Sequence, residues 1–499
     1  MFRRYMKIYK ALSMIVLQYS VIILLPLVFC IFYPEEIHNV SGFFVAALIG
    51  VLIYLSGYLT KIKDIGTITY RDGAILTVAA WVVVSLLSAI PHMVNGGLNF
   101  SQAMFESVSG LTTTGLTMYT DVTKLPKLIL FWRSLMQYVG GAGFALLMLA
   151  TVIGPRGLGF YKAEGRAENL VPNIRRSSRI ILGIYFSYTV VGTIALKIAG
   201  MNLFEALNHT MTALATGGFS TRNGSIGEFN SLTIEIIVMT LMYLGATGFG
   251  IHYAFWKGNW KAVLKNGEPW IYNITIISTS VIITFVGLGK YYKGFWEGFR
   301  IVLFQILSAI TGTGFQTVTL ADPKWPSFYS FMFMLTILMI AGGEMDSTSG
   351  GIKQFRFWVI FNALGDAIKG FLLPKGTVRK RVLYKGEQQI NFSDENIREA
   401  LLVVSLYLLS FIIGSFILMC DGYSVEASMF EFASAMNGVG LSTGVTTPNM
   451  HLVSLWNLII GMFAGRFEFL VIIYALARVF SDIKSSLTKS NRPTAKKFN

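Results

Sequence analysis

Four short stretches rich in glycine, threonine and serine recur along the chain, and their oxygen atoms could coordinate a metal cation. Each has a hydroxyl residue six positions before a shared glycine and a bulky apolar residue one position after it. The stretches are FESVSGLTTTGLT (105–117), LNHTMTALATGGFST (207–221), FQILSAITGTGFQT (304–317) and FEFASAMNGVGLST (430–443), aligned on Gly115, Gly218, Gly314 and Gly440. A ring of carbonyl oxygens can replace an ion's hydration shell, and glycine permits the backbone angles that turn successive carbonyls to one side.

The oxygen donors of these stretches suit a monovalent cation. Ca²⁺ and Mg²⁺ usually take carboxylate ligands, and the stretches contain no carboxylate cluster. Potassium loses its hydration shell at the lowest cost, so K⁺ is the predicted ion. One such stretch alone would be better explained as a packing seam between membrane helices. Four aligned copies instead favour an ion-binding ring.

A polar residue also stands nine positions before each shared glycine. This set is Glu106, His209, Gln305 and Glu431. We interpret these side chains as hydrogen-bonding partners between a short helix and its neighbours, rather than as ion ligands.

The composition places the ring in a membrane. The chain has 499 residues, of which 54% are hydrophobic and only 13% charged, against about a quarter charged in soluble proteins. The apolar runs are continuous over the length of a membrane helix, which favours helices over a barrel. Ten spans are predicted, at about 12–33, 42–60, 73–92, 126–153, 180–200, 231–256, 270–290, 327–352, 398–420 and 452–480.

Basic residues set the expected orientation. The net charge of +15 is better explained by membrane topology than by nucleic-acid binding. Lys and Arg concentrate at the N-terminus, in 155–179, in 353–398 and in the tail. The positive-inside rule makes this side cytoplasmic. We therefore expect a multi-pass protein of the cell membrane with both termini in the cytoplasm.

The aligned stretches define an internal repeat of roughly 100 residues. The predicted fold is an all-α polytopic membrane protein in which four pseudo-symmetric units surround one pore. Each unit consists of a span, a pore helix, a loop and a second span, and two extra spans precede the first unit. The predicted regions are 1–62 (the two extra spans), 63–155, 156–258, 259–370 and 371–482 (the repeats), and 483–499 (a cytosolic tail).

Over nearly its whole length the chain resembles the pore subunits of the Trk/Ktr/HKT potassium transporters, most closely the bacterial Trk type. SGLTTTGLT is similar to the first filter loop of that family and GGFST to its second, and the two extra N-terminal spans are similar to the Trk type. The resemblance implies potassium uptake through a selective pore. The implied K⁺ filter residues are Thr113, Thr114, Gly115, Thr216, Gly217, Gly218, Gly312, Thr313, Gly314, Gly438, Val439 and Gly440.

The eighth predicted span is interrupted by AGGEMDSTSGGIK (341–353). Irregular backbone at membrane depth is tolerated only when it is buried in protein or lines a cavity. The resemblance makes this segment an intramembrane gating loop, although Glu344 and Asp346 depart from the family's Gly, Ala and Ser pattern. The implied gate residues are Gly342, Gly343, Glu344, Asp346, Ser349, Gly350, Gly351 and Lys353, together with Arg466 from the last span.

Arg466 lies deep in an apolar run, where ionisable residues are costly and usually functional. We expect it to form an electrostatic barrier below the filter and to pair with Asp346 or Glu344 in the closed state. The other interpretations are an arginine that reaches an interface, or a structural pair with Glu468.

The resemblance also implies a homodimer that binds a cytosolic, nucleotide-binding regulatory subunit similar to TrkA. The chain has no phosphate-binding loop motif of its own, so we expect K⁺ as transported ion, no organic cofactor and no nucleic acid. Two alternatives remain: a Na⁺ pathway or Na⁺(H⁺)/K⁺ symporter, and a membrane-embedded enzyme. We expect no enzyme, because the sequence has neither H-E-x-x-H nor G-x-S-x-G.

Overall fold

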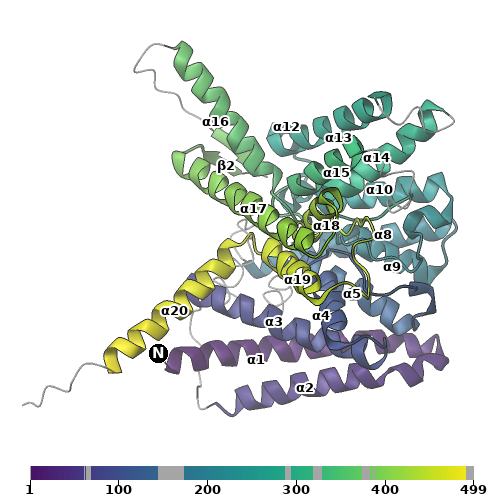
Figure 1. Ribbon diagram of the computed structural model, residues 1–499, viewed down its shortest axis with the longest axis vertical. Coiled ribbons are helices and arrows are strands. Elements are labelled where there is room, and N and C mark those ends of the chain that lie inside the picture. The colour runs from purple at the N-terminus through teal and green to yellow at the C-terminus, as the bar shows by residue number, and fades with distance from the viewer. Residues whose placement is uncertain are drawn as a thin grey trace, which may run out of the picture.

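The computed structural model describes residues 2–60, 62, 69–143, 174–286, 294–318, 329–373, 382–385 and 388–490. The chain begins with two long helices, α1 (Phe2–Leu24) and α2 (Ser41–Tyr58), which pack along each other. The 3₁₀ helices η1 (Leu25–Ile31) and η2 (Pro34–Asn39) join them. In Figure 1 this pair lies at one edge of the molecule, beside α3 (Tyr70–Val94).

Four units with the same order of elements form the rest of the molecule. Each unit has a long incoming helix, a second helix that ends in one of the glycine-containing stretches, and an outgoing helix. In chain order the units are α3, α4 (Phe100–Leu111) and α5 (Lys127–Ala142); α8 (Ile174–Ile198), α9 (Leu203–Leu214) and α10 (Leu232–Ala246); α13 (Gly267–Val286), α14 (Phe295–Thr311) and α15 (Tyr329–Ala341); and α17 (Asp394–Cys420), α18 (Val425–Met436) and α19 (Leu452–Arg466). The predicted helical membrane fold is confirmed.

Three of the second helices are too short to cross a membrane. Helices α4, α9 and α18 have 12 residues each, and at 1.5 Å per residue they span only about 18 Å. Each begins at a polar cap, because the side chains of Asn99, Asn202 and Ser424 accept a backbone N–H of the first turn. These half helices therefore start near one surface and end inside the protein.

The half helices and outgoing helices alternate around a closed circle. Each half helix packs against the outgoing helix of its own unit and against that of the unit before it. The order of contacts is α4, α5, α9, α10, α14, α15, α18, α19 and back to α4. The incoming helices α3, α8, α13 and α17 pack behind the half helices, so that the four glycine-containing stretches meet near the centre.

Three outgoing helices break, and only one of these breaks was predicted. Helix α15 ends at Ala341 and the chain resumes as α16 (Gln354–Leu372), as expected. Helices α10 and α11 (Phe249–Trp256) meet at a bend of 104°, and α19 and α20 (Leu470–Ser490) at 97°. The sequence analysis predicted spans at 231–256 and 452–480 and did not foresee these bends.

Hydropathy alone does not detect these breaks, because the residues around them are apolar enough to continue a span. At the second break Glu468 and Phe469 have φ of 50° and 63°, and the Glu468 carboxylate pairs with Arg356 of α16. Of the predicted span 126–153, the helix ends at Ala142 and the part from 144 on lies outside the described residues. The predicted boundary at 155 lies there too.

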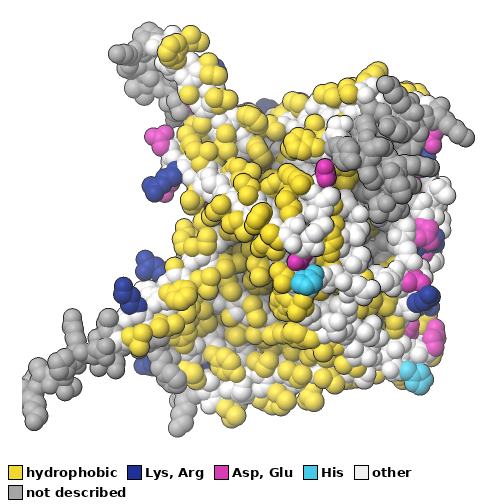
Figure 2. Space-filling view, in the orientation of Figure 1, with side chains coloured by type: hydrophobic (Ala, Val, Ile, Leu, Met, Phe, Trp, Pro, Cys, Tyr) yellow, Lys and Arg dark blue, Asp and Glu magenta, His cyan; other side chains and the backbone are white. Residues whose placement is uncertain are grey.

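The described helices are consistent with a protein that crosses a membrane several times. Six are long and apolar enough to span it, and the two bent pairs bring this to eight. Figure 2 shows hydrophobic side chains over most of the middle of one face, with most Lys and Arg side chains toward its left and right edges. Helices α16 and α20 project from the body on the left of Figure 1.

The remaining described elements are short. A hairpin pairs β1 (Val382–Lys385) with β2 (Gln388–Asn391) in antiparallel register, between α16 and α17. Helix α12 (Trp260–Lys265) and the 3₁₀ helices η3 (Val122–Lys124) and η5 (Ser225–Phe229) lie in connections. None of them enters the central circle of helix contacts.

Candidate functional site

The four stretches fold into loops of the same shape, which we call ring loops 1 to 4 (residues 112–116, 215–219, 311–315 and 437–441). In each, the shared glycine and the residue two positions before it have positive φ. The values are 59° and 89° at Thr113 and Gly115, 52° and 72° at Thr216 and Gly218, 70° and 80° at Gly312 and Gly314, and 65° and 93° at Gly438 and Gly440. The first position tolerates threonine in two loops, whereas the second is glycine in all four.

The same backbone hydrogen bond closes each ring loop. The N–H of the residue before the shared glycine donates to the carbonyl of the hydroxyl residue five positions earlier. The bonds run from Thr114 to Ser109 (2.8 Å), from Gly217 to Thr212 (2.8 Å), from Thr313 to Ser308 (2.9 Å) and from Val439 to Ser434 (2.9 Å). This wide turn at the end of each half helix is the structural reason for the recurring sequence pattern.

The shared glycines and neighbouring carbonyls form a closed ring. A Cβ atom on Gly115 would lie 2.1 Å from the carbonyl oxygen of Gly217, in ring loop 2. The same contact continues from Gly218 to the Thr313 oxygen (2.0 Å), from Gly314 to the Val439 oxygen (2.0 Å) and from Gly440 to the Thr114 oxygen (2.1 Å). Since each contact is made to backbone, any side chain at these glycines would displace a carbonyl of the next loop.

A larger cavity of about 200 Å³ opens on one side of the ring, and all four shared glycines line it. Its other walls come mainly from the segments that follow the ring loops, including Thr117, Ser220, Gln316 and Ser442. Two arginines, Arg133 and Arg222, also reach it. Polar oxygens and backbone therefore surround the approach to the ring.

The polar set beside the half helices hydrogen-bonds the segments that leave the ring loops, in line with our interpretation. Glu106 accepts from Thr117 and Met118, and Glu431 accepts from Ser442 and Thr446. In the second unit the His209 Nε2 atom lies 2.9 Å from the Ser220 hydroxyl.

The third unit is the exception. Both polar side-chain atoms of the buried Gln305 lack a hydrogen-bond partner in the part of the chain that the structure describes.

On the other side of the ring lies the interrupted segment after α15, residues 342–353, which we call the inner loop. The buried Thr348 hydroxyl donates to the carbonyls of Gly245 (2.8 Å) and Leu214 (3.0 Å). A Cβ atom on Gly350 would lie 2.1 Å from the Asn437 carbonyl oxygen, at the start of ring loop 4. The inner loop thus contacts the bases of two ring loops.

Most of the predicted gate residues surround a smaller cavity of about 60 Å³ below the ring. Asp346, Ser349, Gly350, Gly351, Lys353 and Arg466 line it. Gly342 and Gly343 brace the start of the loop: a Cβ atom on Gly342 would lie 2.4 Å from the Gly350 carbonyl oxygen, and the Gly343 N–H donates to the Ser349 hydroxyl at 3.0 Å. The inner loop is folded back on itself.

Arg466 connects the inner loop to the first unit. Its guanidinium donates to the Thr348 carbonyl (3.2 Å) and to the Gly140 carbonyl at the end of α5. Glu344, an expected partner, instead accepts the Gly248 N–H at 2.9 Å. The break between α10 and α11 creates this N–H donor, and the sequence analysis treated that region as continuous helix. Glu468, the partner in the other interpretation of Arg466, forms an ion pair with Arg356 of α16.

Comparison with known proteins identifies the family. A family model described as TrkH, cation transport protein, matches residues 40–265 and 288–485. The chain belongs to the TrkH family of cation transport proteins. An uncharacterized cation transporter of Methanocaldococcus jannaschii is 30% identical over 92% of both chains. The Trk system potassium uptake protein TrkH of Escherichia coli K12 is 28% identical over 94% of this chain and 98% of that protein.

A solved structure has the same fold. The crystal structure of the potassium transporter TrkH from Vibrio parahaemolyticus matches with a TM-score of 0.77 and 26% identity, over 94% of this chain and 98% of that one. The TrkH family is a family of cation transporters and not of enzymes.

The sequence analysis missed several residues of this TrkH-family site. Arg133 and Gln137 of α5 contact the first and second ring loops or the segments that follow them, and Thr348 ties the inner loop to the second unit. Arg133 could have been found from the sequence, because it is an arginine inside a predicted span. Gln137 and Thr348 could not, since their partners are backbone carbonyls from other units.

Proposed function

We propose that this chain is the pore subunit of a Trk-type potassium uptake system and that K⁺ crosses the membrane through the ring. The closed circle of shared glycines and neighbouring carbonyls carries the proposal. Four loops of one backbone shape present oxygens around a common centre, between a larger and a smaller cavity. The potassium uptake named for the Escherichia coli relative agrees with it.

Selection would rest on the backbone of the ring loops. The residues before the shared glycines are Thr114, Gly217, Thr313 and Val439, so no single side-chain type is common to all four. Their carbonyls are the shared feature. Carbonyl oxygens held at fixed positions can replace the hydration shell of K⁺, with discrimination against Na⁺ set by cavity size and by the number and strength of the dipoles.

The inner loop and Arg466 would close the pathway below the ring. A guanidinium that bonds carbonyls of both Thr348 and Gly140 lies between two units that would have to separate at this level. Its positive charge opposes a cation in the smaller cavity. Opening would require the loop to leave its bonds to α9 and α10.

The proposed setting is the inner membrane of a bacterial cell, with both termini in the cytoplasm. Arg4 near the N-terminus pairs with Asp482 of α20 at 2.9 Å. This contact supports the placement of both termini on the same side of the membrane. We further propose a homodimer controlled by a cytosolic nucleotide-binding subunit similar to TrkA. The naming of relatives as components of a Trk system supports such partners.

Ion flux into liposomes that contain the purified chain tests the proposal. We expect uptake of K⁺ and Rb⁺ to exceed that of Na⁺ and Li⁺. Equal rates for the four ions would refute selection by the ring, and absence of uptake both with and without the nucleotide-binding subunit would refute the pore.

A further inference from the structure

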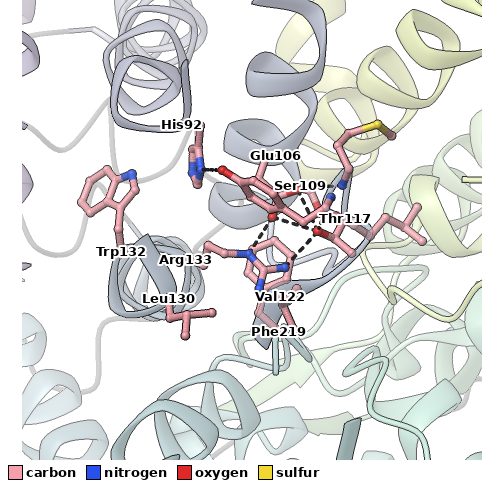
Figure 3. Close-up of polar contacts among 12 residues, drawn as sticks. His92, Glu106, Ser109, Thr117, Val122, Leu130, Trp132, Arg133 and Phe219 are labelled. Carbon is pink, nitrogen blue, oxygen red and sulfur yellow. Dashed lines mark hydrogen bonds and ion pairs between the residues drawn. The ribbon is translucent and has the colours of Figure 1, made fainter. Parts of the chain in front are cut away.

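A buried ion pair lies directly behind the first ring loop. Arg133 of α5 is 2% exposed and Glu106 of α4 is 0% exposed, and the Arg133 Nε atom lies 2.7 Å from the carboxylate. Figure 3 shows the guanidinium pointing at Glu106 and Thr117 from below, with Phe219 against it. Burial of two charges is costly unless both are paired and hydrogen-bonded, so this arrangement fixes the side chains strongly.

The same guanidinium joins the segments that leave two different ring loops. It donates to the Thr117 hydroxyl at 3.0 Å, after ring loop 1, and to the Ser220 carbonyl at 3.3 Å, after ring loop 2. It also lies 4.0 Å from the centre of the Phe219 ring. The planar group of arginine can make these contacts together, whereas a lysine ammonium has no such fork.

Gln137, one turn further along α5, holds ring loop 2 itself. Its Nε2 atom donates to the Gly217 carbonyl at 2.5 Å, and its Oε1 atom accepts the Phe219 N–H at 3.1 Å. The Gly217 carbonyl is the one that a Cβ atom on Gly115, in the neighbouring ring loop, would meet. Residues four apart lie on the same helix face, so Arg133 and Gln137 form one polar stripe along the contact between the first two units.

Among the described residues, only one of the four glycine–carbonyl contacts in the ring has a carbonyl that accepts a side-chain hydrogen bond, namely the contact between Gly115 and Gly217. The corresponding carbonyls of Thr114, Thr313 and Val439 accept no hydrogen bond from a side chain in that part of the chain. An amide N–H also withdraws electron density from the carbonyl that it binds, so Gly217 would be held in place and its pull on an ion weakened.

We propose that Arg133 and Gln137 are positioning residues that fix ring loop 2 against ring loop 1 and thereby set the discrimination between K⁺ and Na⁺. The proposal rests on the proposed function of the ring as a filter. Discrimination requires the oxygens to keep their distances when a smaller ion enters. Without these bonds the Gly217 carbonyl is free to move toward Na⁺.

The test measures Na⁺ and K⁺ uptake into liposomes by the full chain and its variants. Gln137→Met removes both hydrogen bonds and keeps the length of the side chain. The double variant Arg133→Met with Glu106→Gln removes the bridge without leaving an unpaired buried charge. We expect K⁺ uptake to persist in both and Na⁺ uptake relative to K⁺ to rise roughly five- to tenfold, the usual effect of one buried hydrogen bond.

Two matched controls separate this role from general stability. Gln102→Met removes a glutamine that donates to the Pro448 carbonyl and accepts the Asn99 N–H, away from the ring carbonyls. Arg300→Met with Glu235→Gln removes another arginine–glutamate pair, between α14 and α10. Both controls should keep the Na⁺/K⁺ ratio of the unmodified chain. Arg133→Lys should raise it, since one ammonium cannot hold both segments.

The outcomes are distinct. A Na⁺/K⁺ ratio unchanged in Gln137→Met and in the double variant, whatever their thermal stability, would overturn the positioning role. So would an equal rise in the two controls, or full selectivity in Arg133→Lys. If the unmodified chain itself failed to prefer K⁺, the proposed function would be rejected first, and the inference with it.

Discussion

The ring loops and the inner loop are both irregular backbone inside a helical membrane protein, yet the first is a repeated structure and the second is not. The ring repeats one backbone shape four times, and each loop is closed by a bond between its own main-chain atoms. The inner loop occurs once. Backbone bonds from Glu344 and Thr348 to α10 hold it, together with the side chains of Thr348, Glu344 and Arg466. The repeated structure suits a task carried by carbonyls, and the single structure suits a contact that can be made and broken.

The strongest way to break the ring is to add a side chain at a shared glycine. In Gly115→Ser the new Cβ atom would lie 2.1 Å from the Gly217 carbonyl oxygen, so one of the two loops must shift. Overpacking of this kind costs about 1–3 kcal/mol. We expect K⁺ selectivity to fall more than in any other variant considered below, measured as the ratio of Na⁺ to K⁺ uptake in liposomes.

Gly97→Ser is the matched control for that variant. Gly97 also has a positive φ, of 72°, but a Cβ atom there would meet nothing within 4 Å. The Gly97→Ser variant therefore has the backbone strain of a serine at positive φ, but its Cβ atom does not clash with a neighbouring carbonyl. Equal selectivity of Gly115→Ser and the unmodified chain would contradict the closed-ring geometry.

The corresponding break in the inner loop is Arg466→Ala. Hydrogen bonds from a charged group contribute about 1.5–3 kcal/mol each, and this variant loses those to Thr348 and Gly140. We expect K⁺ flux to rise roughly tenfold or more while the Na⁺/K⁺ ratio stays the same. Single-channel or liposome flux recordings measure both quantities.

Arg466→Lys should give a smaller rise in flux, because one ammonium cannot span both carbonyls. Unchanged flux in Arg466→Ala would remove Arg466 from the gate. A changed Na⁺/K⁺ uptake ratio in Arg466→Ala would mean that the inner loop also affects ion selection by the ring loops.

The difference between repeated loops and contacts that occur once also explains which features could be predicted from the sequence. Ring loops leave a pattern, because a backbone shape with left-handed positions demands glycine at Gly115 and its three equivalents. The four units and their ring loops could therefore be located from residue types alone. The break after α15 was also visible, since its glycines and serines interrupt an apolar run.

Single contacts between units leave no such pattern. The bend between α10 and α11 occurs in apolar sequence, and Glu344 caps the N–H of Gly248 that this bend exposes. A carboxylate next to a helix N-terminus is a favourable arrangement, but nothing near Glu344 in the chain indicates that partner. Gln137 and its bond to Gly217 could not be predicted for the same reason.

A subtler change tests the tie between the inner loop and the second unit. Thr348→Val keeps the shape of the side chain and removes the hydroxyl bonds to the Gly245 and Leu214 carbonyls, while the backbone N–H of residue 348 still donates to Gly245. At about 1 kcal/mol for a neutral hydrogen bond, we expect flux to rise roughly fivefold. Thr336→Val, which loses only a bond within α15 to Met332, should leave flux unchanged. An equal rise in both variants would point to general loosening of the helices.

The smallest effect, in the opposite direction, is expected for Glu344→Gln. The buried Glu344 carboxylate has one oxygen bonded to Gly248 and one without a hydrogen-bond partner among the described residues. Glu268 approaches the same loop and accepts the Met345 N–H at 3.0 Å. Two buried carboxylates near each other are unfavourable when both are charged, and glutamine keeps the acceptor oxygen but can never carry a charge. The inner loop should hold slightly better, so flux should fall by less than about threefold. A rise in flux would instead mean that the charge of Glu344 holds the loop in place.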